Sequence, residues 1–98
     1  MYAVIFTAVI DQVDSDYAAT AERMRELAFN EFGCLKFNAC LEDELEIAIS
    51  YWEREEQILA WKQHAEHLTA QQSGRERWYK RYDVEVMQMV RHYHFERD

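Results

Sequence analysis

The sequence predicts a single α+β domain with the element order β-α-β-β-α-β, a ferredoxin-like arrangement with two main helices on one face of a sheet. Three observations predict this class. Residues 2–10 form an apolar run of strand length, helical patterns cover 14–32 and 55–73, and two alternating segments lie between these helices. The length of 98 residues suits one domain, so we treat residues 1–98 as a single unit.

The first strand, YAVIFTAVI at 2–10, is apolar on both of its faces, as expected of a strand covered on both sides. The segment Asp14–Asp16 then offers an N-cap and favourable charges for the first turn of a helix. Apolar residues recur at helical spacing as far as Phe32. Gly33 follows as the expected stop, because a left-handed C-terminal cap favours glycine. The apolar helical positions are Tyr17, Ala21, Met24, Leu27, Ala28 and Phe32.

Two strands are expected at 35–42 and 45–53, and the acidic turn Glu42–Glu44 would join them as a hairpin. In the first strand, one face carries Leu35, Phe37, Ala39 and Leu41, and the other carries Lys36, Asn38, Cys40 and Glu42. In the second strand, Ile47, Ile49 and Tyr51 oppose Ala48, Ser50 and Trp52. Cys34 and Cys40 would lie roughly 20 Å apart on one strand, beyond disulfide reach, so we expect both to be reduced.

A second helix is expected from 55 to 73, with Gly74 as its stop and an apolar stripe of Ile58, Trp61, Ala65 and Leu68. The segment GRERWYKRY, 74–82, predicts a short third helix that leads into a last strand at 83–95. That strand would reach roughly 43 Å, which is longer than usual. It either breaks at a bulge near Met87–Met89 or extends across to another subunit.

The expected fold leaves one apolar sheet face uncovered, because both helices lie on the other face. Two such sheets packed face to face would bury both surfaces, so we expect a homodimer. The share of hydrophobic residues, 49%, is high for a small monomer and favours the same conclusion.

The acidic composition excludes several classes of partner. The formal net charge is −8, which disfavours nucleic acid and anionic membranes. No apolar run approaches the ~20 residues of a transmembrane helix, and no basic stretch precedes the apolar start as in a signal peptide. We therefore expect a cytoplasmic protein.

Gly33 and Gly74 are the only glycines, so a glycine-rich loop for nucleotide or flavin is excluded.

The stretches IAISYWE (47–53), EEQILAWKQHAEH (55–67) and GRERWY (74–79), followed by a long closing strand, resemble the antibiotic biosynthesis monooxygenase family. The likeness extends from the first strand to Phe95. It implies a dimeric α+β barrel. Some members of that family oxidise aromatic polyketide intermediates with molecular oxygen and no cofactor, some act on quinols, and others degrade haem.

The haem-degrading branch matches this chain poorly. The helical tryptophan of that branch falls on Trp61, but the position of its haem-ligating histidine holds Gln71. Its first-strand asparagine is replaced by Phe6 and Thr7. The resemblance therefore implies no haem, and we expect no cofactor.

The polyketide-oxidising branch resembles the chain more closely. There, a helical tryptophan and a polar side chain six residues later face an apolar pocket, and these positions are Trp61 and His67, a histidine in place of tyrosine. The serine that follows the strand-end tryptophan in the family is Arg54 here, which weakens the helix cap. Glu55 and Glu56 offset that loss through the helix dipole.

The stretch WKQHAEH, 61–67, holds the candidate catalytic residues. At about 100° per residue His64 lies on the flank of the apolar stripe and His67 about 60° further round, so both can border a pocket, although His67 could equally face water. A histidine can accept a proton from a phenol near neutral pH. Trp61 would form a pocket wall unless it is only core, and Tyr51 and Asn38 are further candidates for the lining.

Two other clusters of residues could bind a ligand. The four histidines could hold zinc if the helix pair met His92 and His94, but those two lie near the chain end, so no metal is expected. The basic cluster Arg75, Arg77, Lys80 and Arg81 could receive a carboxylate or phenolate, but it also fits a solvated face.

Two functions remain open from the sequence. The first is a cofactor-independent monooxygenase that deprotonates a small, flat phenolic, anthrone or quinol substrate with a pocket histidine, His64 or His67, before molecular oxygen reacts. The second is a non-catalytic dimer that binds a small molecule or serves a stress response.

Overall fold

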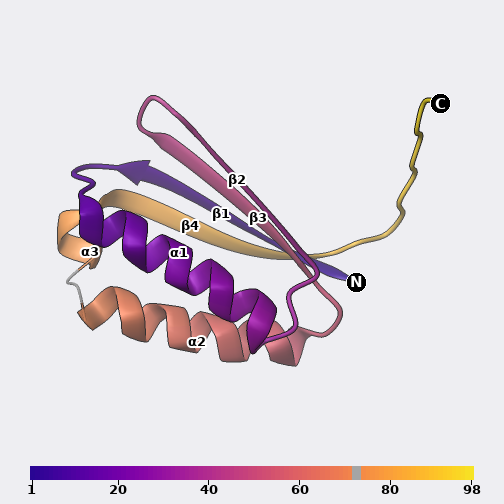
Figure 1. Cartoon of the computed structure of the whole chain (residues 1–98), viewed down its shortest axis with the longest axis horizontal. Helices are drawn as coiled ribbons and strands as arrows, with labels where there is room; N and C mark the ends of the chain where they lie inside the picture. The colour runs from indigo at the N-terminus through magenta and orange to yellow at the C-terminus, as the bar shows by residue number, and fades with distance from the viewer. Residues whose placement is uncertain (72–73) are drawn as a thin grey trace.

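In the computed structural model, which describes residues 1–71 and 74–98, an antiparallel sheet carries both long helices on one face (Figure 1). The sheet has the strand order β2-β3-β1-β4. This confirms the predicted ferredoxin-like α+β class. In chain order the elements are β1 (Tyr2–Ile10), α1 (Ser15–Asn30), β2 (Lys36–Glu42), β3 (Leu45–Trp52), α2 (Glu55–Gln71), α3 (Gly74–Arg77) and β4 (Tyr79–Gln88).

β1 is an inner strand of the sheet, with a paired strand on each side. It pairs with β3 on one side and with β4 on the other, so that Phe6 lies opposite both Ala48 and Val84. Val4, Ala8 and Ile10 point to the helix-covered face of β1 and are buried. The alternate residues of β1 face the open side of the sheet.

The hydrophobic core lies between the sheet and the two helices. Its buried members come from both layers: Val4, Ala28, Cys34, Trp52 and Ile58. Trp52 and Ile58 are almost fully excluded from solvent, as is Trp78 between α3 and β4. A fully buried tryptophan contributes about 3–5 kcal/mol by the cost of its truncation, so Trp52 is a main anchor of the fold.

α1 begins where the sequence predicts. The Asp14 carboxylate accepts a hydrogen bond from the backbone N–H of Tyr17 at 3.0 Å, which satisfies one of the unpaired donors of the first turn. The helix ends at Asn30, two residues earlier than expected. Gly33 has a φ of 83°, in the left-handed region that favours glycine.

α2 replaces the missing serine cap by a different bond. The backbone N–H of Arg54 donates to the side-chain oxygen of Gln57 at 3.0 Å, which is the returning half of a capping box. The Gln57 amide also lies against Gly33, where an added Cβ would come within 2.5 Å of its nitrogen. The end of α1 and the start of α2 are therefore fitted to each other.

Gly33→Ala is expected to destabilise the protein by about 1–3 kcal/mol, because alanine is strained at this positive φ and its Cβ displaces Gln57. Chemical denaturation monitored by circular dichroism measures the loss. Ala60→Gly, at an exposed position inside α2, offers a comparison that should cost roughly 0.5–1 kcal/mol. A Gly33→Ala variant as stable as the parent chain would contradict the fitted junction.

The C-terminal part differs from the prediction in its boundaries. The predicted end of the second helix at residue 73 lies outside the described residues, and Gly74 begins α3 rather than ending a helix. Tyr79 already belongs to β4, because it pairs with Ile10 across a register shift after Val9. β4 ends at Gln88, so the expected strand to residue 95 is wrong, and the irregularity of this strand pair lies at its start.

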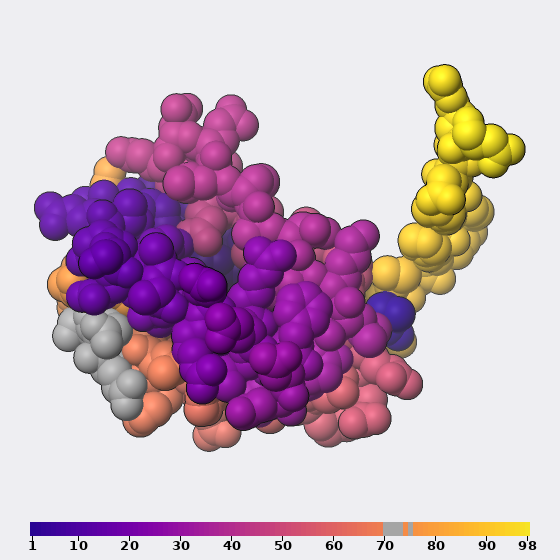
Figure 2. All heavy atoms as spheres, in the orientation of Figure 1, coloured from indigo at the N-terminus to yellow at the C-terminus, as the bar shows by residue number. Residues whose placement is uncertain are grey.

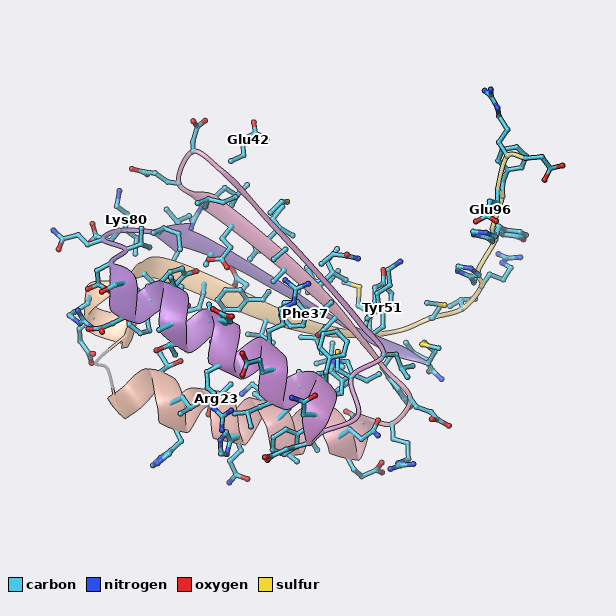
Figure 3. The ribbon with its side chains drawn as sticks, in the orientation of Figure 1. Arg23, Phe37, Glu42, Tyr51, Lys80 and Glu96 are labelled. Carbon is cyan, nitrogen blue, oxygen red and sulfur yellow. The ribbon has the colours of Figure 1, made fainter. Side chains whose placement is uncertain are left out.

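Residues 89–98 run away from the body of the chain, as the yellow segment shows in Figures 1 and 2. A last backbone bond, from the N–H of Met89 to the carbonyl of Met1, marks where the segment leaves the sheet. Val90, Tyr93 and Phe95 are 86%, 83% and 84% exposed, so these apolar side chains have almost no cover within their own chain. Figure 3 shows Glu96 far out on this segment.

The two cysteines differ in their surroundings. Cys34 precedes β2 instead of lying on it, which corrects the expected placement, and it is buried in the core. Burial raises the pKa of its thiol. Cys40 is exposed on β2, and both are free thiols.

Candidate functional site

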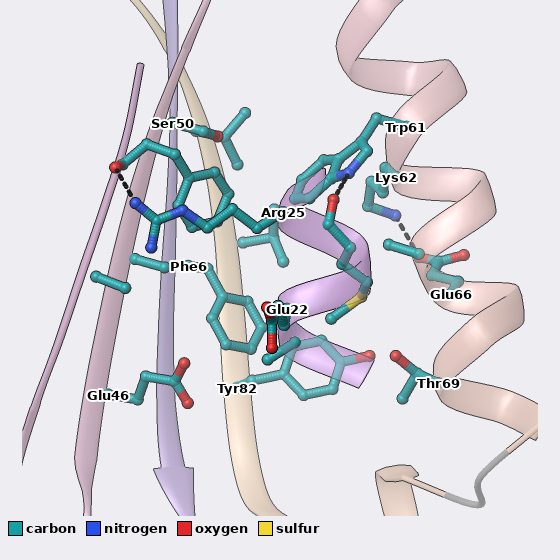
Figure 4. A pocket seen from close by; sticks show the side chains of 18 of the residues that line it. Phe6, Glu22, Arg25, Glu46, Ser50, Trp61, Lys62, Glu66, Thr69 and Tyr82 are labelled. Atoms are coloured by element: carbon teal, nitrogen blue, oxygen red, sulfur yellow. Dashed lines mark hydrogen bonds and ion pairs between the residues drawn. The ribbon is translucent and has the colours of Figure 1, made fainter. Parts of the chain in front are cut away.

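A pocket of about 1300 Å³ lies between the helix-covered face of the sheet and the helices α1 and α2. All four strands and all three helices contribute to its lining. Figure 4 shows Trp61 at one end of this space and Glu46 with Tyr82 toward the other. The two ends differ in chemistry.

The Trp61 end is aromatic and fixed in place. The indole N–H of Trp61 donates to the backbone carbonyl of Met24 at 2.9 Å, which ties α2 to α1. Its ring lies 5.3 Å from that of Trp52 and 6.2 Å from that of Phe37, the latter edge to face. A ring held by three neighbours presents a preorganised surface for a flat aromatic ligand.

The opposite end holds the carboxylate of Glu46 among tyrosines. Glu46, on β3, is half-buried, and the Tyr17 hydroxyl of α1 donates a hydrogen bond to its Oε2. Tyr79 and Tyr82 of β4 pack on each other at 5.4 Å between ring centres, and both contact Phe6. Three phenol side chains thus lie near the Glu46 carboxylate at this end of the pocket.

Burial changes the acidity of this end. Burial raises the pKa of the Glu46 carboxyl above its ordinary value. The pKa of Tyr79 is also raised, first by burial and then by the nearby charge of Glu46 and by Tyr82. Tyr79 therefore stays a neutral phenol at physiological pH, whereas Glu46 holds its proton at a higher pH than an exposed glutamate.

Charged groups border the pocket on the helix side. Arg25 donates to the backbone carbonyl of Phe37 at 3.3 Å, and its guanidinium lies 5.4 Å from the centre of the Phe37 ring. Lys62 pairs with Glu66 one turn further along α2 at 2.6 Å. Both cations are thus held by partners at the rim, and these exposed pairs contribute little to stability.

Of the residues predicted to form the site, Trp61 lines the pocket. His64 and His67 do not: both are exposed, and His64 lies 5.8 Å from Phe32 between ring centres. The expected position of the histidines at the pocket border is therefore wrong, and their predicted catalytic role stays a prediction.

Helical geometry explains why the histidines miss the pocket. At about 100° per residue, His64 and His67 lie roughly 130° and 170° from the middle of the arc that faces it. The pocket opens on the other flank of the apolar stripe from the one that carries the histidines. The lining arc of α2 comprises Ile58, Trp61, Lys62, Ala65, Glu66 and Thr69.

Asn38 and Tyr51 also lie outside the lining, on the opposite face of the sheet. Neighbours one residue away, Phe37 and Ala39 on β2 and Ser50 on β3, point into the pocket, and side chains alternate between faces. Either face of each strand could line a pocket by its residue pattern, and only the position of the helices decides between the two faces.

The remaining clusters show no built site in the described part of the chain. No three His, Cys, Asp or Glu side chains converge there as metal ligands, and His92 and His94 stack on the extended C-terminal segment. Of the basic cluster, Arg77 pairs with Asp14 at 2.8 Å and Lys80 with Glu44 at 3.3 Å. The side chain of Arg75 lies outside the described residues.

Sequence reasoning missed the carboxylate end of the pocket. One signal was present: Glu46 stands on the same strand face as Ala48, Ser50 and Trp52, so an acidic residue occupies a face that is otherwise buried. Helical spacing predicts Tyr17 as an apolar position of α1 and indicates no partner for its hydroxyl. The approach of β4 to α1 could not be read from spacing.

The chain is similar to one known protein in sequence and to several solved structures in fold. No family model matches it. It is 41% identical over 91 residues, 92% of this chain and 80% of the relative, to the uncharacterized protein YqjZ of Bacillus subtilis (strain 168). The chain belongs to the YqjZ family.

Solved structures relate this YqjZ-family chain to the antibiotic biosynthesis monooxygenases by fold. A mutant of SnoaB, a cofactor-independent oxygenase from Streptomyces nogalater, superposes with a TM-score of 0.73 at 10% identity, over 93% of this chain and 94% of SnoaB. An antibiotic biosynthesis monooxygenase-type protein from Nitrosomonas europaea gives 0.70 at 16% identity, over 93% and 100%. These likenesses confirm the fold that the sequence resemblance implied.

Proposed function

We propose that the protein is a cofactor-independent monooxygenase that oxidises a small, flat phenolic, anthrone or quinol substrate with molecular oxygen. One observation carries this proposal: a large pocket with a fixed tryptophan wall at one end and ionisable groups at the other, Glu46 among them. The shared fold with SnoaB, a cofactor-independent oxygenase, supports it.

The pocket suits each requirement of such a reaction. A flat ring can stack on Trp61 and Phe37, and apolar side chains form much of the lining around it. Removal of a proton then makes an electron-rich anion that can pass electrons to oxygen. For an anthrone, one oxygen atom replaces the two methylene hydrogens as a carbonyl and the other leaves as water, so the reaction needs no external reductant.

Oxygen uptake by the purified protein with a panel of anthrones and quinols tests the proposal. Substrate-dependent oxygen uptake well above the spontaneous rate supports the proposal. If the protein accelerates uptake with no compound of the panel, the proposal is rejected. Tryptophan fluorescence measures binding of the same compounds in parallel. The alternative function is a non-catalytic dimer that binds a ligand. The exposed positions of the predicted bases, His64 and His67, favour this alternative, which requires ligand binding without oxygen uptake.

The same assay tests the predicted role of the histidines. If His64 or His67 is the base, His64→Ala or His67→Ala should lower turnover by about 100-fold or more. Because both side chains are exposed and lie outside the lining, the geometry favours unchanged rates in both variants.

A further inference from the structure

Glu46 is an unusual side chain for the buried face of a strand. It follows the same alternation as Ala48, Ser50 and Trp52, so its carboxylate points toward the helices and lines the pocket (Figure 4). Carboxylates are rarely placed on such a face unless they are paired. Its side chain is half-buried, and burial is the factor that shifts its pKa.

The surroundings of Glu46 hold it in place without neutralising it. The Tyr17 hydroxyl donates to Oε2, and in the described part of the chain no lysine or arginine forms an ion pair with this carboxylate. Within residues 1–71 and 74–98, the Tyr17 donor holds one oxygen and leaves acceptor capacity on the group, because a carboxylate offers about four lone-pair sites. That capacity is available to a ligand in the pocket.

We propose that Glu46 is the proton acceptor of this pocket, binding the hydroxyl of a phenolic substrate whose rings extend toward Trp61, with Tyr17 as the residue that positions it. The proposal rests on the proposed function for its substrate class. If the protein binds its ligand without oxidising it, Glu46 still binds the hydroxyl of that ligand.

The proposed step transfers one proton from the substrate hydroxyl to the Glu46 carboxylate. The substrate O–H bond breaks, its electron pair stays on the substrate oxygen as a phenolate, and the proton moves to a Glu46 oxygen. An ordinary phenol and an ordinary glutamate differ by about six pKa units, which makes this transfer unfavourable. Burial of the carboxylate narrows that gap, since it makes Glu46 a stronger base.

The neighbouring groups define the expected pH dependence. Tyr17 on α1 and the tyrosines of β4 face Glu46 most closely. Activity requires the ionised carboxylate, so turnover should rise as the pH rises through the pKa of Glu46, which lies above the ordinary glutamate value. The other charged groups of the lining are Glu22, Arg25 and Glu26 on α1, Lys62 and Glu66 on α2, and Glu76 on α3.

The test compares the parent chain with Glu46→Gln, which keeps the shape and removes the base. Dihydroxyanthrone serves as the oxidisable probe, and dihydroxyanthraquinone as a probe that binds without reacting. Glu46→Gln should lower oxygen uptake by about 100-fold or more, a typical general-base contribution, while binding changes only a few-fold. Glu56→Gln, an exposed glutamate of α2 outside the lining, makes the same charge change and should leave the rate unaltered.

A second readout is independent of turnover. The phenol and phenolate forms of the bound quinone differ in visible absorbance, so its pKa can be titrated in the pocket. The negative charge of Glu46 disfavours the phenolate, so Glu46→Gln should lower the pKa of the bound phenol by about one unit or more. Tyr17→Phe should shift the acidic limb of the rate profile to higher pH, because the lost hydrogen bond had stabilised the carboxylate.

The outcomes separate the two proposals. Uptake in the parent chain with an unchanged rate and pH profile in Glu46→Gln would overturn Glu46 as the base and leave the monooxygenase intact. No uptake in any chain would overturn the monooxygenase, and the pKa of the bound quinone then decides whether Glu46 binds the hydroxyl. An unaltered pKa of the bound quinone in Glu46→Gln would reject Glu46 as its partner.

Discussion

Trp61→Ala is expected to lower the apparent second-order rate of oxygen uptake with a flat substrate by roughly 50–100-fold. The reason is contact area: about 100 Å² of ring surface at about 25 cal/mol per Å² corresponds to about 2.5 kcal/mol. Binding measured by equilibrium dialysis should weaken by a similar factor. The stability loss should stay below the ~3–5 kcal/mol of a fully buried tryptophan, because Trp61 is only partly buried.

Two companion variants separate the parts played by Trp61. Trp61→Phe keeps an aromatic wall but loses the donor to the Met24 carbonyl, so it should retain most of the binding and lose some stability. Leu59→Ala, on the exposed side of the same helix, should change neither. Full binding by Trp61→Ala would show that the substrate does not stack there.

Ile49→Glu is expected to convert a homodimer into monomers. In one chain the helices cover a single sheet face (Figure 1), and the other face presents half-buried apolar side chains, among them Ile5, Ile47 and Ile49. We propose that this face packs on a second copy, with an interface above ~2,000 Å² as in obligate dimers. An unpaired carboxylate in such an interface costs several kcal/mol.

Light scattering at micromolar concentration gives the mass of the assembly, against 11.9 kDa for one chain. Leu59→Glu, which places the same charge on an exposed position of α2, should leave the dimer intact. Circular dichroism of both variants reports whether the chains are folded. A parent chain that scatters as a stable folded monomer would end the dimer proposal.

The helices of residues 1–71 and 74–98 were expected not to span a membrane. None of them combines the length and the hydropathy that a membrane span requires.

The order of elements could be predicted because each depends on local chemistry. Asp14 caps α1 through its own backbone turn, and Gly33 adopts a left-handed conformation that few other residues accept. The two apolar faces of β1 indicate cover on both sides of the sheet, and α1 and α2 supply that cover on one side. The boundaries of helices and strands differ from the prediction where tertiary pairing competes with a local sequence pattern. Tyr79 is drawn into β4 by pairing with Ile10.

The site divides along the same line. The residue pattern of α2 places Trp61 on the apolar stripe and predicts that a pocket between helix and sheet could use it. The flank of the stripe that the pocket occupies depends on how the helices pack on the sheet, and that packing leaves His64 and His67 outside the lining. It also brought Tyr17 to Glu46 across 29 residues of chain. Helical and strand periods give the direction of a side chain relative to its own element, whereas a site depends on how separate elements pack together.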